Sequence, residues 1–168
     1  EGFKIAPHAD FLQSRVPVLV NNDCHIVLAA PKQSMETYFY KNADADEMIF
    51  IHQGNGKLLT QYGELTFSYG DYLVIPRGTI YQVVFESTDN RLLVVESFSP
   101  IRFPKRYLSH YGQLLEHSPF CERDIRAPQH LVTLDEQGDF VIKVKKQGRM
   151  YHLHYAYHPF DVIGWDGC

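Results

Sequence analysis

The regular alternation of short apolar runs with turn residues through the middle of the chain is the feature that most constrains its fold. Runs rich in β-branched and aromatic residues follow one another there, and Gly, Pro, Asn and Asp interrupt them at intervals of about eight to ten positions. Intervals this short leave no room for crossover helices, so we expect a mostly β, antiparallel sandwich or barrel with little helix. The expected strands cover residues 25–30, 37–40, 48–53, 57–61, 64–68, 72–75, 81–86, 92–97, 140–145 and 149–157.

The sequence divides into four stretches. Residues 1–24 show neither the helical nor the strand period and are expected to form an irregular lead-in. Residues 25–98 hold the barrel core. Residues 99–137 are rich in proline and charge and predict a long irregular excursion, with helical turns only at 107–116. Strands return within residues 138–168.

Composition excludes several classes of protein. In 168 residues, 45% are apolar and 21% are charged, which is typical of a packed globular chain. A net charge of −4 argues against nucleic-acid binding, because that binding requires clustered Lys and Arg. No apolar run approaches the roughly 20 residues that span a bilayer, so we expect no membrane segment and a cytoplasmic location.

The cysteines are few and far apart. Cys24, Cys121 and Cys168 form no CxxC pair, so neither a disulfide framework nor a zinc site of paired cysteines is indicated. This usage fits a reducing compartment.

An acidic cluster precedes the expected strand at 48–53. Asn42, Asp44, Asp46 and Glu47 superficially resemble a calcium-binding loop. A helix-flanked calcium loop needs Gly at its sixth position and a bidentate Glu at its twelfth, and neither is in register here. The favoured interpretation is a polar turn that begins a strand.

Three histidines near the end of the chain are candidate metal ligands. On a strand, His152 and His154 share a face about 7 Å apart, and His158 could supply a third imidazole. The alternative is that the tyrosines between them face the core while the histidines face solvent or another subunit. No carboxylate stands nearby in the sequence to complete a metal site.

Two blocks resemble the paired motifs of cupin barrels. Residues 47–54 end in Gly54, which would close a hairpin, and residues 70–78 end in a Pro-Arg-Gly turn before the last strand. The resemblance implies a cupin-like jelly-roll barrel for the core.

Metal-binding cupins carry a His-x-His pair before a Glu and a further His after the second block. Glu47 keeps the acidic position, but the histidine positions are occupied by Tyr40 or Lys41, by Asn42 or Ala43, and by Tyr81. A mononuclear iron site of this type uses two imidazoles and a carboxylate, so this barrel is expected to hold no metal. His52 lies five residues beyond Glu47 on the opposite face and is interpreted as an ordinary strand histidine.

Taken together, several blocks over nearly the whole chain resemble the homogentisate 1,2-dioxygenase family. The matching stretches are residues 39–47, 63–64, 77–78, 98–104, 112–117, 122–125, 146–148 and 158–165. The resemblance implies a homo-oligomeric enzyme of tyrosine and phenylalanine breakdown, which cleaves a small aromatic substrate with O₂ at Fe(II).

In that family the two histidines and the glutamate that bind iron belong to a second barrel. The resemblance therefore implies that this chain stops before that barrel and that none of its residues is catalytic or cofactor-binding. We expect the 168-residue segment to bind no iron, to be inactive alone, and to serve structure and oligomerisation. Apolar surface left without its partner barrel should make the segment prone to association.

Two alternatives remain open. The barrel could be a free-standing module that binds a small aromatic or sugar among Phe50, Tyr72, Tyr81 and Tyr151, because barrel mouths are common ligand sites. Otherwise His152, His154 and His158 could form the metal site of an unrelated enzyme.

Overall fold

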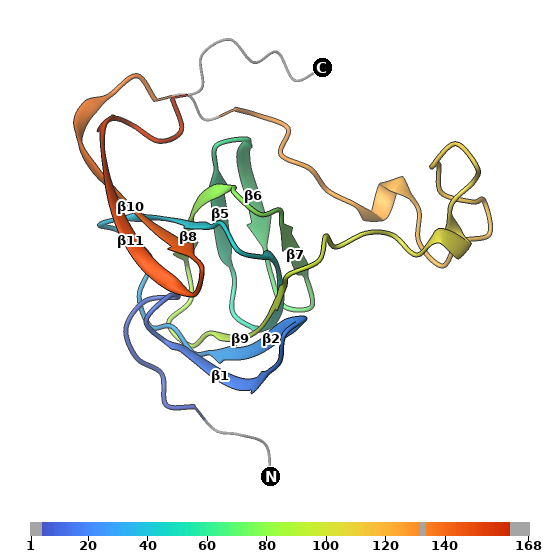
Figure 1. Ribbon diagram of the computed structural model, residues 1–168, viewed down its shortest axis with the longest axis horizontal. Coiled ribbons are helices and arrows are strands. Elements are labelled where there is room, and N and C mark those ends of the chain that lie inside the picture. The colour runs from blue at the N-terminus through green and yellow to red at the C-terminus, as the bar shows by residue number, and fades with distance from the viewer. Residues whose placement is uncertain (1–4, 132–133, 162–168) are drawn as a thin grey trace.

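Two β-sheets pack face to face to form the body of the molecule (Figure 1). The structure is a computed structural model that describes residues 5–131 and 134–161. In spatial order, the first sheet contains β1 (Arg15–Val20), β2 (Cys24–Ala29), β9 (Arg91–Ser97), β4 (Asp46–Gln53) and β7 (Tyr72–Ile75). The second contains β11 (Arg149–Tyr157), β10 (Gln137–Lys146), β3 (Phe39–Asn42), β8 (Ile80–Phe85), β5 (Gly56–Thr60) and β6 (Gly63–Phe67). The predicted mostly β fold is confirmed.

Alternation along each strand places the core between the sheets. In β9, Leu92, Val94 and Glu96 are buried while the residues between them are partly exposed. Residues from both sheets meet in one main cluster that includes Ile49, Ile51, Tyr40 and Tyr81. The barrel interior is therefore filled by side chains.

A second, smaller core lies under the returning strands. β10 pairs in parallel with β3, from Ile142 opposite Phe39 to Lys145 opposite Asn42, and this is the exception to the antiparallel pattern. Phe39, Ile142 and Phe160 are buried in this second core. A tight turn with positive φ at Gln147 (52°) and Gly148 (68°) joins β10 to β11, where the sequence predicted a turn.

Two expectations about local structure were wrong. The lead-in is not irregular throughout, because Arg15–Val20 forms β1 on the edge of the first sheet. Pro17 and the register shift between Pro17 and Leu19 hide the strand period in the sequence. The expected helical turns at 107–116 do not form. This segment instead makes a tight loop around Gly112 (φ 84°), where Leu108 and Leu114 form an isolated bridge.

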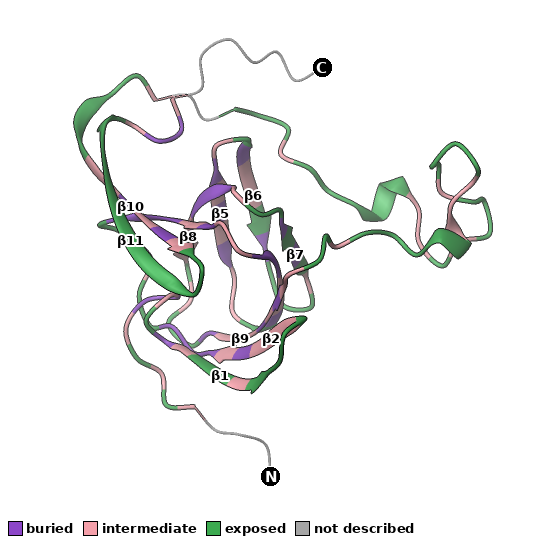
Figure 2. Cartoon of the chain, in the orientation of Figure 1, coloured by how far each residue is buried: buried purple, intermediate pink, exposed green. Residues whose placement is uncertain are grey.

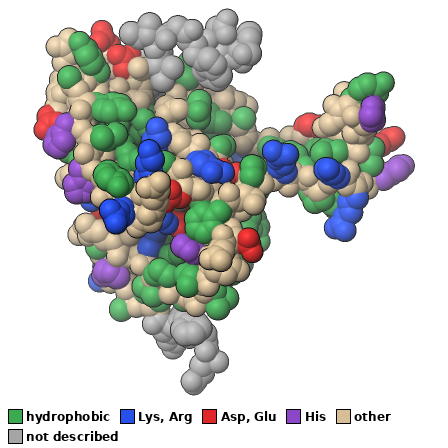
Figure 3. All heavy atoms as spheres, viewed as in Figure 1, with side chains coloured by type: hydrophobic (Ala, Val, Ile, Leu, Met, Phe, Trp, Pro, Cys, Tyr) green, Lys and Arg blue, Asp and Glu red, His purple; other side chains and the backbone are tan. Residues whose placement is uncertain are grey.

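The excursion projects from the barrel as a separate lobe, on the right of Figure 1. Its described helices are two short 3-10 turns, Lys105–Tyr107 and Glu122–Asp124. Phe103 and Tyr107 both pack against Phe120, while Tyr111 is 88% exposed. Acidic, basic and histidine side chains are all visible on the lobe in Figure 3. The lobe thus has a small aromatic cluster of its own, and Arg126 ties its return segment to the barrel by an ion pair with Asp71 at 2.9 Å.

Helices in the described residues are all too short and too polar to cross a membrane.

Candidate functional site: a buried ionic cluster in the barrel

Two glutamates face each other inside the barrel. Antiparallel pairing of β4 with β9 places Glu47 directly opposite Glu96, and both side chains point into the core. Only 1% of Glu47 and 2% of Glu96 is exposed. Burying two negative charges side by side is costly unless cations and hydrogen-bond donors compensate them.

Arg15 supplies the compensating charge from β1. Its Nη1 lies 2.7 Å from Glu47 Oε1 and 3.2 Å from Glu96 Oε1, so one guanidinium bridges both carboxylates. The guanidinium also stacks over the ring of Phe11 at 4.3 Å. Burial, the largest single cause, lowers the pKa of Arg15, but the charge of Glu47, the nearby Tyr81 and Tyr40 and the hydrogen bond to Glu47 together raise that pKa well above its ordinary value. Arg15 is therefore permanently charged.

Neutral donors complete the shell around Glu47. Asn42 Nδ2 donates to Oε1 of Glu47 (3.2 Å) and of Glu96 (3.4 Å). The hydroxyl of Tyr81 donates to Glu47 Oε2 at 2.5 Å and accepts from Arg15 Nη2 at 3.1 Å. Burial, and then the nearby Glu47 charge, raise the pKa of Tyr81 well above its ordinary value, so Tyr81 stays a proton donor.

Glu96 has cationic partners of its own toward the edge of the barrel. Lys145 on β10 donates a short charge-assisted hydrogen bond to Glu96 Oε2. His25 on β2 places Nδ1 3.3 Å from the same oxygen and is partly exposed. Arg15 and Lys145 supply two positive charges for the two carboxylates, so the cluster needs no further cation.

The cluster occupies the positions that the cupin pattern assigns to metal ligands. Glu47 and Tyr81 meet there, as the cupin resemblance implied, and of the open pair Asn42 or Ala43 it is Asn42 that joins them. Tyr40 packs edge-on against Tyr81 at 5.4 Å. The hydroxyl of Tyr40 is buried and has no hydrogen-bond partner among the described residues. Burial, and then the charge of Glu47, raise the pKa of Tyr40 above its ordinary value.

Fe(II) does not fit this arrangement. An ion between the two carboxylates would need the space that the Arg15 guanidinium fills. Within residues 5–131 and 134–161, no three His, Cys, Asp or Glu side chains are grouped to hold a metal. The donor set and the internal cation thus both disfavour a metal at this position.

The three candidate histidines do not form one site. His154 Nδ1 lies 2.7 Å from Asp139 Oδ1, with both side chains exposed. His158 packs edge-on against Phe39 at 5.1 Å, and its Nδ1 accepts a hydrogen bond from the backbone N–H of Phe160. His152 stands on β11, which is exposed along its whole length (Figure 2). In the alternative that placed the tyrosines toward the core and the histidines toward solvent, the placement of the tyrosines is wrong, whereas His152 and His154 are exposed.

In the acidic loop at residues 42–47, the side chains of Asn42, Asp44 and Asp46 accept hydrogen bonds from backbone N–H groups. Asn42 Oδ1 accepts from the backbone N–H groups of Asp44 and Ala45, which makes the predicted polar turn before β4. Asp44 accepts from the backbone of the β10–β11 turn at residues 147–148. Asp46 accepts from the N–H groups of Arg77 and Ile101. The carboxylates thus fix neighbouring loops against the barrel.

The four aromatic residues considered as a binding site are scattered. Phe50 and Tyr72 stack at 4.8 Å on the outer face of the first sheet, whereas Tyr81 is buried inside the barrel and Tyr151 is exposed on β11. These four residues therefore do not line one site.

His52 is exposed on the face of β4 opposite Glu47, as predicted. Cys24 and Cys121 are free, and Cys168 lies outside the described residues.

Sequence reasoning missed Arg15, Glu96 and Lys145. Glu96 carried a usable signal, because it stands at a buried position of the alternating pattern in β9. Arg15 and Lys145 gave none, since they lie outside the expected barrel core and reach the site only through the pairing of β1 and β10.

The fold and the cluster define a cupin-like barrel domain whose interior is closed by a salt-bridged arginine. The chain belongs to the homogentisate 1,2-dioxygenase N-terminal family, whose model matches residues 11–168. A curated relative, named "Putative dioxygenase SSO1533", from Saccharolobus solfataricus, is 35% identical over 164 residues. That match covers 98% of this chain but 42% of the relative, so the chain spans less than half of the relative's length.

Solved structures with a similar fold are cupins, although the likeness is distant. KdgF from Halomonas sp. superimposes with a TM-score of 0.45 at 19% identity, over 51% of this chain and 80% of that protein. A cupin-2 domain protein from Shewanella frigidimarina gives a TM-score of 0.44 at 19% identity, over 50% and 79% of the two chains. These likenesses concern the fold and carry no functional argument.

Proposed function

We propose that this chain is the N-terminal, structural barrel of an Fe(II)-dependent dioxygenase that opens the ring of homogentisate or a related dihydroxylated aromatic acid. The observation that carries the proposal is the Arg15–Glu47–Glu96 cluster, in which an internal guanidinium fills the position a cupin metal would take. A barrel closed in this way can support a neighbour but has no open coordination position for substrate or O₂.

Family membership and length support the rest of the proposal. The relative extends well beyond the matched region, which leaves room for a second barrel with the iron ligands. On this proposal the iron and the catalytic residues belong to that second barrel. The N-terminal barrel holds it in place and contributes to contacts in a cytoplasmic homo-oligomer.

Measurement of O₂ uptake tests whether the catalytic activity belongs to the second barrel and not to this chain. The 168-residue chain, supplied with Fe(II) and homogentisate, is expected to consume no O₂ and to retain no stoichiometric iron after gel filtration. A longer protein that also contains the region following the matched part is expected to consume O₂ with homogentisate. Ring cleavage by the 168-residue chain would overturn the structural role, and an inactive iron-loaded longer protein would overturn the proposed chemistry.

Substrate identity needs a separate comparison. Dihydroxylated aromatic acids with and without the acetate side chain of homogentisate should be compared by kcat/KM in the longer protein. A clear preference for another member of this class would keep the dioxygenase assignment and change the substrate.

A further inference from the structure

The outer face of the first sheet is apolar across four strands. Cross-strand pairing aligns Ile26, Val95, Met48 and Val74 in one row. The next row on the same face contains Leu28, Leu93, Phe50 and Tyr72. An antiparallel sheet with one face in water normally alternates apolar with polar residues, so this sheet is patterned for burial on both faces.

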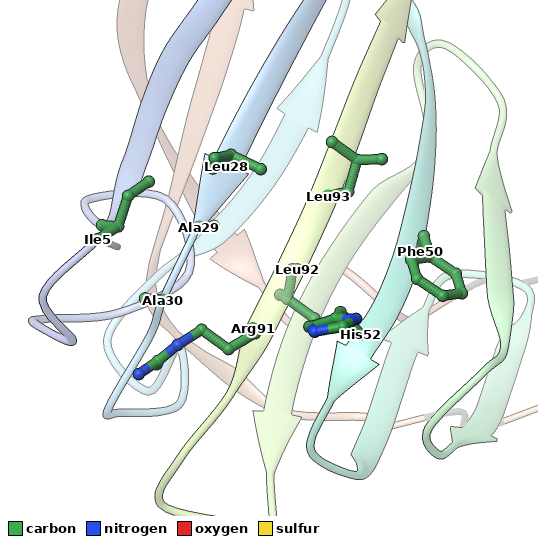
Figure 4. Close-up of a pocket in the computed structure, with 9 residues that line it drawn as sticks. All are labelled: Ile5, Leu28, Ala29, Ala30, Phe50, His52, Arg91, Leu92 and Leu93. Carbon is green, nitrogen blue, oxygen red and sulfur yellow. The ribbon is translucent and has the colours of Figure 1, made fainter. Parts of the chain in front are cut away.

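This outer face is nevertheless uncovered at its β7 edge, and its other members are partly exposed. Tyr72 is 62% exposed and Val74 is 51% exposed. Figure 4 shows Leu28, Leu93 and Phe50 on neighbouring strands around a hollow of about 270 Å³, which Ile5 also lines. His52 and Arg91 stand at its rim, where a register shift after Ile51 interrupts the pairing of β4 with β9. A hollow of this kind accepts an apolar side chain of a docking partner.

The second sheet gives the contrast. The outward rows of its β5, β6 and β8 are Thr66, Lys57 and Val84, and Glu64, Leu59 and Gln82. These rows mix charged, polar and apolar residues, with an ion pair between Lys57 and Glu64 at 3.4 Å, and their Leu59 packs against the second core. The apolar rows on the first sheet are therefore a property of that face and not of all strands in the chain.

We propose that the outer face of the first sheet, the two rows named above, is the docking surface for the part of the longer family protein that follows the matched region. This inference rests on the proposed function for the identity of the occupant. The matched region covers only 42% of the relative, so the remaining majority of that polypeptide has to pack against something. Four strands about 4.8 Å apart present a face roughly 15 Å wide, which suits a second sheet packed face to face.

The partner surface is a complementary apolar sheet face with one projecting side chain that fills the hollow between Leu93 and Phe50. An inter-domain contact of this kind buries roughly 600–1,500 Å². Covering Tyr72 and Val74 removes from water the most exposed members of the two rows.

A charge introduced into the face tests the inference. The 168-residue chain is mixed with the separately produced remainder of a longer family protein, and association is measured by calorimetry. Val74→Lys is expected to weaken association by about tenfold or more, because it buries an unpaired charge at the contact. Val84→Lys, the same exchange on the outward face of β8 in the second sheet, is the matched control and is expected to change the dissociation constant by less than about twofold. Far-UV circular dichroism checks that both variants are folded.

Three outcomes would overturn the inference. Equal effects of Val74→Lys and Val84→Lys would place the contact elsewhere. Absence of association between the two parts would remove the proposed occupant. A homodimer of the 168-residue chain that Val74→Lys dissociates would make a second copy the occupant. None of these readouts depends on ring cleavage, so failure of the dioxygenase assignment is detected separately by O₂ uptake in the longer protein.

Discussion

At the scale of single residues, the barrel is organised around a permanent internal cation. The Arg15 side chain reaches Glu47 across 32 residues of sequence and Glu96 across 81. Removing one partner from a buried ion pair leaves the other charge unpaired, which costs more than the pair itself contributes. The cluster is thus expected to be most sensitive to changes that unbalance its charge.

Arg15→Met keeps much of the side-chain volume but leaves Glu47 and Glu96 without their shared donor. We expect a loss of about 3–5 kcal/mol in the free energy of unfolding, measured by urea denaturation. Arg126→Met, which removes an exposed ion pair with Asp71, is the control and should cost less than about 1 kcal/mol. In Arg15→Met/Glu47→Gln the losses should be smaller than the sum of the single losses. Additive losses would contradict the shared cluster.

His158 gives a prediction for pH. Its pKa is lowered, chiefly by burial against the aromatic rings, and its Nδ1 must stay unprotonated to accept from the Phe160 N–H. The unfolded chain therefore binds a proton at higher pH than the folded chain does, and the stability contribution is lost as pH falls below about 6.5. His158→Gln should flatten the slope of stability against pH between pH 7 and 5. An unchanged slope would exclude His158 as its source.

At the scale of secondary-structure elements, the two cations of the cluster come from strands outside the stretch that carries the cupin-like motifs. β1 carries Arg15 and pairs with β2 at the edge of the first sheet, and β10 carries Lys145 and pairs with β3 in the second sheet. The cupin resemblance implied that Glu47, Tyr81 and either Asn42 or Ala43 would meet, because these residues lie on or beside strands of the recognised motifs. Pairing between distant strands is set by tertiary packing, so the sequence could not predict either cation.

The same distinction applies to the elements themselves. The strands of the core were predictable because buried and partly exposed residues alternate along β9, which is the period of two expected for a strand. β1 was missed because Pro17 interrupts that period, and the loop around Gly112 was mistaken for helical turns because apolar residues at 107–116 fit a short helical pattern as well as a compact loop.

Gly54 tests the hairpin that the motif places between β4 and β5. At φ 110°, an added Cβ would lie 2.2 Å from Asn90 Oδ1, and Asn90 is buried and bonded to the carbonyl oxygen of Pro31. Gly54→Ala should cost about 2–4 kcal/mol from backbone strain and disturbed hydrogen bonds. Gly70→Ala is the matched control, because Gly70 has φ 90° and no neighbouring atom within 4 Å, and it should cost only about 1 kcal/mol. Equal losses would show that Asn90 moves aside freely.

At the scale of the whole molecule, the chain leaves the barrel after β9 and returns to it with β10. The lobe between them projects away from the body (Figure 1), and its return segment passes over Gly63, where an added Cβ would meet the carbonyl oxygen of His130 at 2.3 Å. The hairpin of β10 and β11 is held by the ladder to β3 and by the second core. The returning hairpin should therefore depend on the barrel and not on the lobe.

Limited proteolysis tests this independence. Trypsin is expected to cut first at an exposed basic residue of the lobe, such as Arg106 or Arg123. Both residues lie in short 3-10 turns that contain no buried residue, so the backbone there can open locally and enter the protease. The two fragments should co-elute in native gel filtration and separate only in denaturant, because β3–β10 pairing and the Lys145–Glu96 ion pair still join them. In Ile142→Asp, which places a charge in the second core, the cut fragments should separate without denaturant. Separation of the wild-type fragments in native buffer would show that the lobe itself holds the hairpin in place.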